Sequence, residues 1–202
     1  MSIKSSKVQA TTRRPKHDPK ESEREILNAA EQLLRERSFR DINVDEVMRR
    51  TGLKRPAFYV HFRDRHDLAL RVVQHIGLEL FEMSNRWLEG DDMLGALEGL
   101  VEVYQRQGSV LRSLADAAGA DERVEQAYRT LVQDFITATI RHIREKQENG
   151  YINKAINIEE TARALIWLNE RYLSETLGRM PQANPQDVVN VIYNIWKSAL
   201  YG

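Results

Sequence analysis

The segment from residue 44 to 68, VDEVMRRTGLKRPAFYVHFRDRHDL, is the feature that most constrains the fold of this chain. Asn43 directly precedes the segment, and Glu46 lies three residues after Asn43. This spacing is typical of a capping box at the start of a helix. Gly52 comes soon after, and glycine adopts the left-handed backbone conformation that a helix end or a tight turn requires. The pattern therefore predicts a short helix followed by a tight turn.

A second helix is predicted to begin near Lys54 or Arg55, because Pro56 then falls in its first turn, where a missing amide hydrogen has no helical partner. Phe58 and Phe62 are four residues apart and form its buried side. Two short helices joined by a tight turn are the pattern of a helix-turn-helix DNA reader, in which the second helix recognises DNA. The side chains left to face DNA are Lys54, Arg55, Ala57, Tyr59 and His61.

The rest of the chain also has helical periodicity. Apolar residues recur with helical spacing from Glu21 onward, and Asp64 with Asp67 predicts the capped start of the helix that leaves the reader. Gly108 and Gly119 are among the predicted breaks between later helices. After the reader, helices are predicted over residues 67–88, 92–107, 109–117, 121–148, 158–178 and 185–200. The sequence shows no strand-like alternation, so the predicted fold class is all-α.

Charge is distributed unevenly along the chain, although the formal net charge is zero. Residues 1–75 contain 17 Lys and Arg against 11 Asp and Glu, a net of +6, and the remaining residues balance this with −6. A basic end is drawn to a polyanion and gives salt-dependent affinity for DNA, although a solvated surface is the alternative reading. Residues 1–20 contain six Lys and Arg against one Asp. They are predicted to be a disordered basic arm that either follows DNA or only solubilises the protein.

The composition argues against several classes of protein. The chain has no cysteine, which removes disulfides, thiolate metal sites and cysteine nucleophiles. No stretch approaches the roughly twenty apolar residues of a membrane span, and the first residues contain no secretory signal. The five histidines show no metal-binding spacing, and no nucleotide-binding loop or hydrolase motif is present. We therefore expect a cytoplasmic protein that is not an enzyme and holds no metal or cofactor.

The pattern Thr-Gly-Leu, then Pro-Ala-Phe-Tyr-x-x-Phe and a charged Asp-Arg-x-x-Leu, resembles the tetracycline-repressor (TetR) family. The segments WLNERYL at 167–173 and IWKSALYG at 195–202 resemble the ethionamide-regulator (EthR) branch of that family. The resemblance implies a helix-turn-helix domain over residues 21–66 that binds a double-stranded DNA operator. It also implies a helical domain over residues 67–202 that binds a small-molecule effector and forms a homodimer.

The helix geometry and the resemblance together assign the DNA contacts. Lys54 and Arg55 lie at the amino end of the predicted recognition helix, the end that enters the major groove. Arg55 is expected to bind guanine in a bidentate manner. The resemblance implies that Tyr59, His61 and Arg65 contact phosphates, with Tyr59 alternatively a packing residue. Asn43, at an exposed helix start, is expected to do the same. The full predicted DNA-binding set is Asn43, Lys54, Arg55, Pro56, Ala57, Tyr59, His61 and Arg65.

Asn169 carries the argument for a ligand pocket. It falls in the middle of an apolar stripe on the helix predicted over 158–178, and a buried, unpaired amide costs about 1–3 kcal/mol. It must therefore bond a neighbouring group, a water or a ligand, and the ligand is expected to be largely apolar with one carbonyl or amide facing Asn169. Glu170 and Arg171 are expected to form ion pairs near the dimer or domain surface. The ligand-binding residues implied by the resemblance are Leu97, Tyr104, Tyr128, Val132, Phe135, Thr139, Asn169 and Trp196.

The last two helices carry more apolar residues than one domain needs, so they are expected to pack on their copies in a dimer. These residues are Ile166, Leu173, Leu177, Val188, Val189, Ile192, Ile195 and Leu200. The hypothesis is a ligand-responsive transcriptional repressor that binds a palindromic operator and is released when a ligand tilts the helix that starts near Asp67. Two alternatives stay open: a small-molecule sensor and a helical scaffold, neither of which binds DNA sequence-specifically.

Overall fold

The structure is a computed structural model that describes residues 18–119 and 121–202. Every regular element in these two ranges is helical, which confirms the predicted all-α class. The helices, with one short 3₁₀ helix, η1, are α1 (Pro19–Glu36), η1 (Phe39–Asp41), α2 (Val44–Thr51), α3 (Arg55–His61), α4 (Arg65–Leu88), α5 (Met93–Ala118), α6 (Glu122–Glu148), α7 (Ile158–Leu177) and α8 (Pro185–Tyr201).

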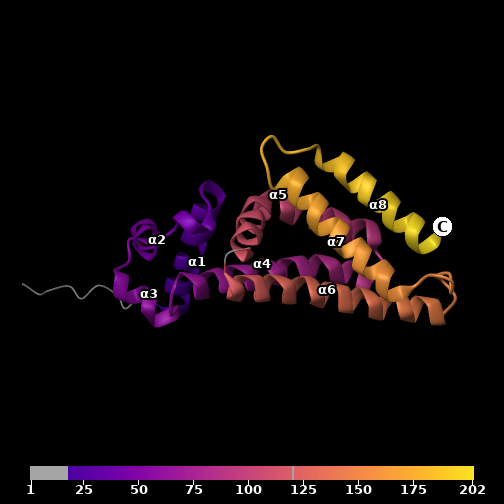
Figure 1. Cartoon of the computed structure of the whole chain (residues 1–202), viewed down its shortest axis with the longest axis horizontal. Helices are drawn as coiled ribbons and strands as arrows, with labels where there is room; N and C mark the ends of the chain where they lie inside the picture. The colour runs from indigo at the N-terminus through magenta and orange to yellow at the C-terminus, as the bar shows by residue number, and fades with distance from the viewer. Residues whose placement is uncertain (1–17, 120) are drawn as a thin grey trace, which may run out of the picture.

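The helices form an elongated molecule with two unequal ends. Helices α1, α2 and α3 gather at one end, and α4 runs from them into a larger body (Figure 1). Within the body α4 lies alongside α6, and α5 packs against α4, α6, α7 and α8. Most buried apolar residues of both ends belong to one continuous core, and Tyr128, Val132 and Ile136 of α6 form a second, smaller cluster. The small end and the body are therefore joined by packed side chains as well as by α4 itself.

Local capping explains where the short helices begin and end. The side chain of Asn43 accepts a hydrogen bond from the amide of Glu46 (3.0 Å), and Gly52 ends α2 with a φ of +67°. The carboxylate of Asp64 accepts from the amides of His66 (2.8 Å) and Asp67 (2.9 Å) at the start of α4. These caps confirm the predicted helix starts and the turn, because each motif satisfies backbone groups that the first or last helical turn leaves free. The boundary predicted between residues 66 and 67 falls inside α4, two residues after its start.

The first helix begins earlier than the sequence pattern predicts. Asp18 caps α1 by accepting from the amide of Lys20 (3.1 Å), and Pro19 takes the first helical position. Proline suits that position because its missing amide hydrogen would have no partner there. The last residues assigned to the basic arm thus belong to α1, and residues 1–17 of that predicted arm lie outside the described residues.

The break predicted at Gly108 is wrong, because α5 runs without interruption from Met93 to Ala118. Gly108 instead marks a close crossing of α5 and α7. A Cβ atom placed on it would lie 3.1 Å from the Cα and N atoms of Gly178 and 3.2 Å from the carbonyl carbon of Leu177. The glycine is therefore explained by the approach of two backbones, a long-range feature that local sequence does not reveal.

Gly108→Ala is expected to lower the free energy of unfolding by about 1–3 kcal/mol, because the added methyl overpacks the helix crossing. The matched control is Gly119→Ala, where the nearest atom to an added Cβ is the Asp116 carbonyl oxygen at 3.7 Å. Urea unfolding followed by circular dichroism measures both variants. Equal stability of Gly108→Ala and Gly119→Ala would show that the crossing is not tight.

The apolar residues predicted for a dimer interface on α7 and α8 are mostly used within one chain. Leu173, Leu177, Val188, Ile192 and Leu200 are each at most 1% exposed in the monomer. The prediction for these residues is wrong because α5 packs beneath both helices and takes up their apolar sides. Trp167 on α7 and Val191 on α8 are 40% and 44% exposed. Across both described ranges, none of the helices combines the length and the apolar character needed to cross a bilayer.

Candidate DNA-binding surface and ligand cavity

Helix α3 is fixed by two buried phenylalanines and presents its other side to solvent. Phe58 and Phe62 are 0% and 1% exposed, and their ring centroids lie 5.3 Å apart. This confirms the predicted buried side. The remaining predicted DNA-binding residues surround α3 and the adjacent helix starts, and Ala57, His61 and Arg65 are partly buried. The exposed members are Asn43, Lys54, Arg55, Pro56 and Tyr59.

Arg55 has partners within the small end that the sequence pattern did not reveal. Its guanidinium donates to both carboxylate oxygens of Asp45 on α2 (2.5 and 2.6 Å) and to the hydroxyl of Tyr59 (3.1 Å). The hydrogen bonds with Tyr59 and Asp45 raise the pKa of Arg55 above its already high value, so it stays cationic. All three side chains are exposed, and such surface ion pairs are worth little in water. Separating Arg55 from Asp45 therefore costs little free energy.

Arg65 is directed into the protein. Its guanidinium donates to the carbonyl oxygens of Arg40 (3.3 Å) and Ile42 (3.2 Å) and lies 5.2 Å from the centroid of the Phe39 ring. These contacts tie the start of α4 to the segment that precedes α2. The phosphate contact predicted for Arg65 would require them to be given up.

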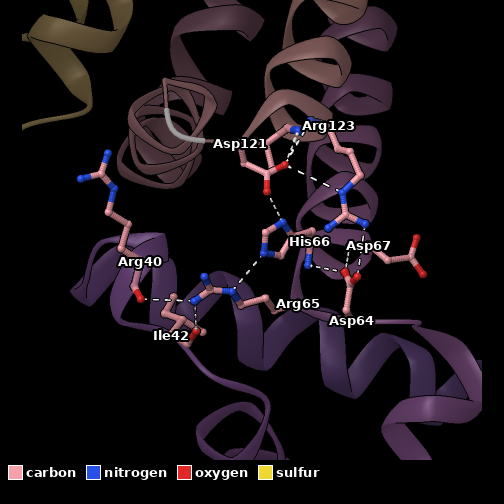
Figure 2. Close-up of polar contacts among 9 residues, drawn as sticks. Arg40, Ile42, Asp64, Arg65, His66, Asp67, Asp121 and Arg123 are labelled. Carbon is pink, nitrogen blue, oxygen red and sulfur yellow. Dashed lines mark hydrogen bonds and ion pairs between the residues drawn. The ribbon is translucent and has the colours of Figure 1, made fainter.

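A polar joint connects the start of α4 to the start of α6 (Figure 2). His66 on α4 pairs with Asp121, the residue that caps α6, and Arg65 donates to the His66 ring (3.2 Å). Asp64, which caps α4, accepts from Arg123 of α6 (3.2 Å). Burial acts to raise the pKa of Asp64, but the Asp67 amide, Arg123 and the His66 amide outweigh it and lower the pKa. The two helix starts are thereby linked close to the helix-turn-helix.

A second joint connects α1 and η1 to α5. Buried Glu31 accepts from the amide group of Gln107 on α5 (3.1 Å), and its other oxygen lies 3.1 Å from Nδ1 of His75 on α4. The hydroxyl of Ser113 on α5 accepts from the backbone amide of Phe39 (3.2 Å). The small end is therefore held by α4, α5 and α6 together.

The larger body contains a mostly apolar cavity among α4, α5, α6, α7 and α8. Its atom-free space is about 820 Å³, including the part open to solvent. The room left inside it for a guest is only about 80 Å³, so a drug-sized molecule would enter only if the cavity walls moved apart. All eight residues predicted to bind ligand line this one cavity, namely Leu97, Tyr104, Tyr128, Val132, Phe135, Thr139, Asn169 and Trp196.

Asn169 has a structural partner at the cavity wall. Its Oδ1 atom accepts a hydrogen bond from the indole nitrogen of Trp196 on α8 (3.0 Å). The indole N–H only donates, so this contact fixes which end of the amide is oxygen. Among the described residues, the Asn169 amide nitrogen has no hydrogen-bond partner. Of the readings that the sequence left open, the structure shows a neighbouring group that satisfies the oxygen. The N–H₂ group has no such partner among the described residues.

Glu170 does not form the surface ion pair predicted for it. It lines the cavity, and its Oε1 atom accepts from the hydroxyl of Tyr128 (2.5 Å). Arg171 pairs instead with Glu175, one turn further along α7 (3.1 Å). Burial raises the pKa of the Tyr128 hydroxyl well above its ordinary value, so Tyr128 remains a donor. Sequence reasoning misplaced Glu170 because the wall at this point is built by α6, which is distant in the chain.

Helix α4 supplies cavity residues that the sequence analysis did not identify. Leu80, Ser84 and Trp87 all line the cavity, and their spacing of four and three residues places them on one helix face. This spacing is the sequence feature from which these cavity residues could have been predicted. Helix α4 therefore contacts the cavity near its carboxyl end and the helix-turn-helix at its amino end.

Two protein-family models together match most of the described chain. Residues 26–72 match the model for bacterial regulatory proteins of the tetR family, and residues 93–202 match that for the carboxy-terminal domain of the transcriptional regulator EthR. The HTH-type transcriptional regulator EthR of Mycobacterium tuberculosis H37Rv is 28% identical over 199 residues, covering 95% of this chain and 91% of that protein. EthR of Mycolicibacterium smegmatis is 26% identical over 196 residues, covering 94% and 89% of the two chains.

Solved structures share the fold. NalD, described as the secondary repressor of the MexAB-OprM multidrug efflux pump in Pseudomonas aeruginosa, matches with a TM-score of 0.70 and 20% identity, covering 91% of this chain and 98% of that one. GusR of Salmonella enterica matches with a TM-score of 0.72 and 15% identity, covering 89% and 95%. At these identities the likeness concerns the fold alone, whereas the two family models assign the sequence. The chain belongs to the tetR family of bacterial transcriptional regulators, in the branch that carries the EthR carboxy-terminal domain.

Proposed function

We propose that this regulator is a repressor that binds a palindromic double-stranded operator as a homodimer and is released by a mostly apolar small molecule. The observation that carries the proposal is one continuous helix, α4, with the helix-turn-helix at one end and cavity residues at the other. A regulator needs such a connection, because an effector acts only through its different affinities for two conformations.

Helix α6 offers a second route between the cavity and the DNA-binding end. It carries Tyr128, Val132 and Phe135 of the cavity wall, and its capped start holds α4 through the His66 and Arg123 contacts. A guest that pushes α4 and α6 apart in the cavity would change the angle at which α3 is presented. Two recognition helices must fit successive major grooves roughly 34–36 Å apart, so a small change of angle is enough to lose the fit.

The dimer required by this proposal would use the outer sides of α7 and α8, where Trp167 and Val191 are exposed. The second copy doubles the number of DNA contacts and gives the operator its two-fold symmetry. A cytoplasmic location follows from the proposed DNA target.

Arg55→Ala is expected to lower the ratio of operator affinity to scrambled-duplex affinity by about 5-fold to 150-fold. This corresponds to about 1–3 kcal/mol for a bidentate base contact. Selection from random duplexes identifies the preferred sequence, and gel-shift titration then compares it with a scrambled duplex. Arg171→Ala removes the same charge from α7 and serves as the control. If Arg55→Ala distinguished the operator from the scrambled duplex as well as the wild type does, Arg55 would not take part in base recognition.

The same selection separates this proposal from the two alternatives. A sensor without DNA recognition, or a helical scaffold, would enrich no sequence from random duplexes. The exposed Lys54 and Arg55 at the amino end of α3 favour the repressor, since cations at that position are suited to the major groove.

A further inference from the structure

A carboxylate lines a cavity that is otherwise almost entirely apolar. Glu170 is partly buried, and one of its oxygens accepts from Tyr128 (2.5 Å). The other oxygen has no hydrogen-bond partner in the part of the chain that the structure describes. Because Glu170 is only partly buried, its second oxygen is open to a hydrogen bond from water or from a guest.

No basic side chain of the described residues pairs with Glu170. Its neighbour Arg171 binds Glu175 at 3.1 Å. Burial dominates the raised pKa of Tyr128, and the charge of Arg171 opposes this rise without pairing with Glu170. The polar groups closest to Glu170 in the cavity are phenol hydroxyls, and these carry no positive charge. Burial, followed by the charge of Glu170, raises the pKa of Tyr104, which keeps this residue neutral at any working pH. A cation in direct contact with Glu170 would therefore come from solvent or from a guest.

The cavity that Glu170 lines also contains aromatic rings, which are suited to a cation. Tyr104 and Tyr128 line the same cavity, together with Phe135 and Trp87. Aromatic faces attract ammonium groups by roughly 0.5–2 kcal/mol, and the effect is larger where water is excluded. A carboxylate backed by aromatic rings binds an organic cation better than it binds a neutral group of the same shape.

We propose that the cavity selects effectors that carry an ammonium group on an apolar body, with the ammonium bound by Glu170. This inference rests on the effector function proposed above, and it adds a charge requirement to that function. The Asn169 amide then serves an acceptor elsewhere on the same guest, because consecutive residues of α7 point in different directions.

Three probes with one apolar body test the charge requirement: phenylbutylamine, phenylbutanol and phenylpentanoate. They share the apolar body and end in an ammonium, a hydroxyl or a carboxylate. Isothermal titration calorimetry on the full chain is expected to show the amine binding about 10-fold to 100-fold more tightly than the alcohol, as a charged hydrogen bond predicts. The carboxylate is expected to bind most weakly, because it meets a like charge.

Glu170→Gln is expected to remove the preference for the amine and to leave the affinity for the alcohol nearly unchanged. Glutamine keeps an oxygen that accepts from Tyr128, so the wall is preserved while the charge is lost. The control is Glu175→Gln, which makes the same change on α7 outside the cavity and should keep the wild-type preference. A role limited to holding Tyr128 would change the affinities for amine and alcohol equally.

The outcomes separate the two proposals. If the alcohol binds the wild type, and Val132→Phe weakens it by filling the cavity, the effector site stands whatever the amine does. With that site established, equal affinities for amine and alcohol, or a preference that survives in Glu170→Gln, would overturn the role of Glu170 alone. If none of the probes binds at millimolar concentration and none releases DNA, the cavity is not an effector site and both proposals fall.

Discussion

Phe58→Ala is expected to cost about 3–5 kcal/mol of folding free energy and to abolish DNA binding. Phe58 is fully buried, and together with Phe62 at the end of α3 it packs into the core and holds α3 against the small end. Removing the ring leaves a cavity that the short α3 cannot fill, since a helix of seven residues depends on packing for its stability. Urea unfolding measured by circular dichroism gives the change in free energy, and gel shift gives the loss of DNA binding.

Val60→Ala is the matched control for Phe58→Ala. It lies on the same helix and is 73% exposed, so its effect on stability should stay within about 0.5 kcal/mol. If the two variants were equally stable, α3 would not be fixed by its phenylalanines, and the presentation of Lys54 and Arg55 would need another explanation.

Asn169→Leu is expected to abolish the response to a neutral effector and to lower stability by about 1–3 kcal/mol. The stability loss arises because the buried Trp196 indole N–H loses its acceptor. The affinity for a carbonyl-bearing probe such as phenylbutyramide should fall by about 10-fold or more, because the free N–H₂ group is removed. Calorimetry measures the affinity, and DNA binding in the absence of probe should be unchanged.

Asn169→Asp separates the two roles of the amide. Aspartate retains an acceptor for Trp196 but has no N–H₂ group to donate. The variant should therefore keep the indole contact and still lose affinity for phenylbutyramide. Wild-type affinity in Asn169→Asp would show that the amide orients Trp196 and does not bind the guest.

The sequence allowed correct prediction of those features that depend on neighbours in the chain. The caps at Asn43 and Asp64, the turn at Gly52 and the buried pair Phe58 and Phe62 each rest on residues within four positions of one another. The eight cavity residues come from four helices, and only the family resemblance brought them together.

The features that sequence reasoning missed depend on contacts between distant segments. Local sequence predicts a helix break at Gly108, because it does not show that this glycine approaches Gly178, seventy residues away. The ion pair of Arg55 with Asp45 and the contact of Glu170 with Tyr128 also join different helices. The sequence predicts a dimer interface on the apolar sides of α7 and α8, because no local pattern shows that α5 packs against both helices.

The central claim is that a guest bound in the cavity lowers the affinity of α3 for DNA. The most direct test measures, by fluorescence anisotropy, the affinity for the selected operator duplex with and without saturating phenylbutylamine. The wild type should bind the duplex more weakly with probe present, while Val132→Phe should bind it equally in both conditions. Since coupling between two ligands is reciprocal, the duplex should weaken probe binding by the same factor. An operator affinity that does not change when calorimetry shows the cavity to be occupied would contradict the account.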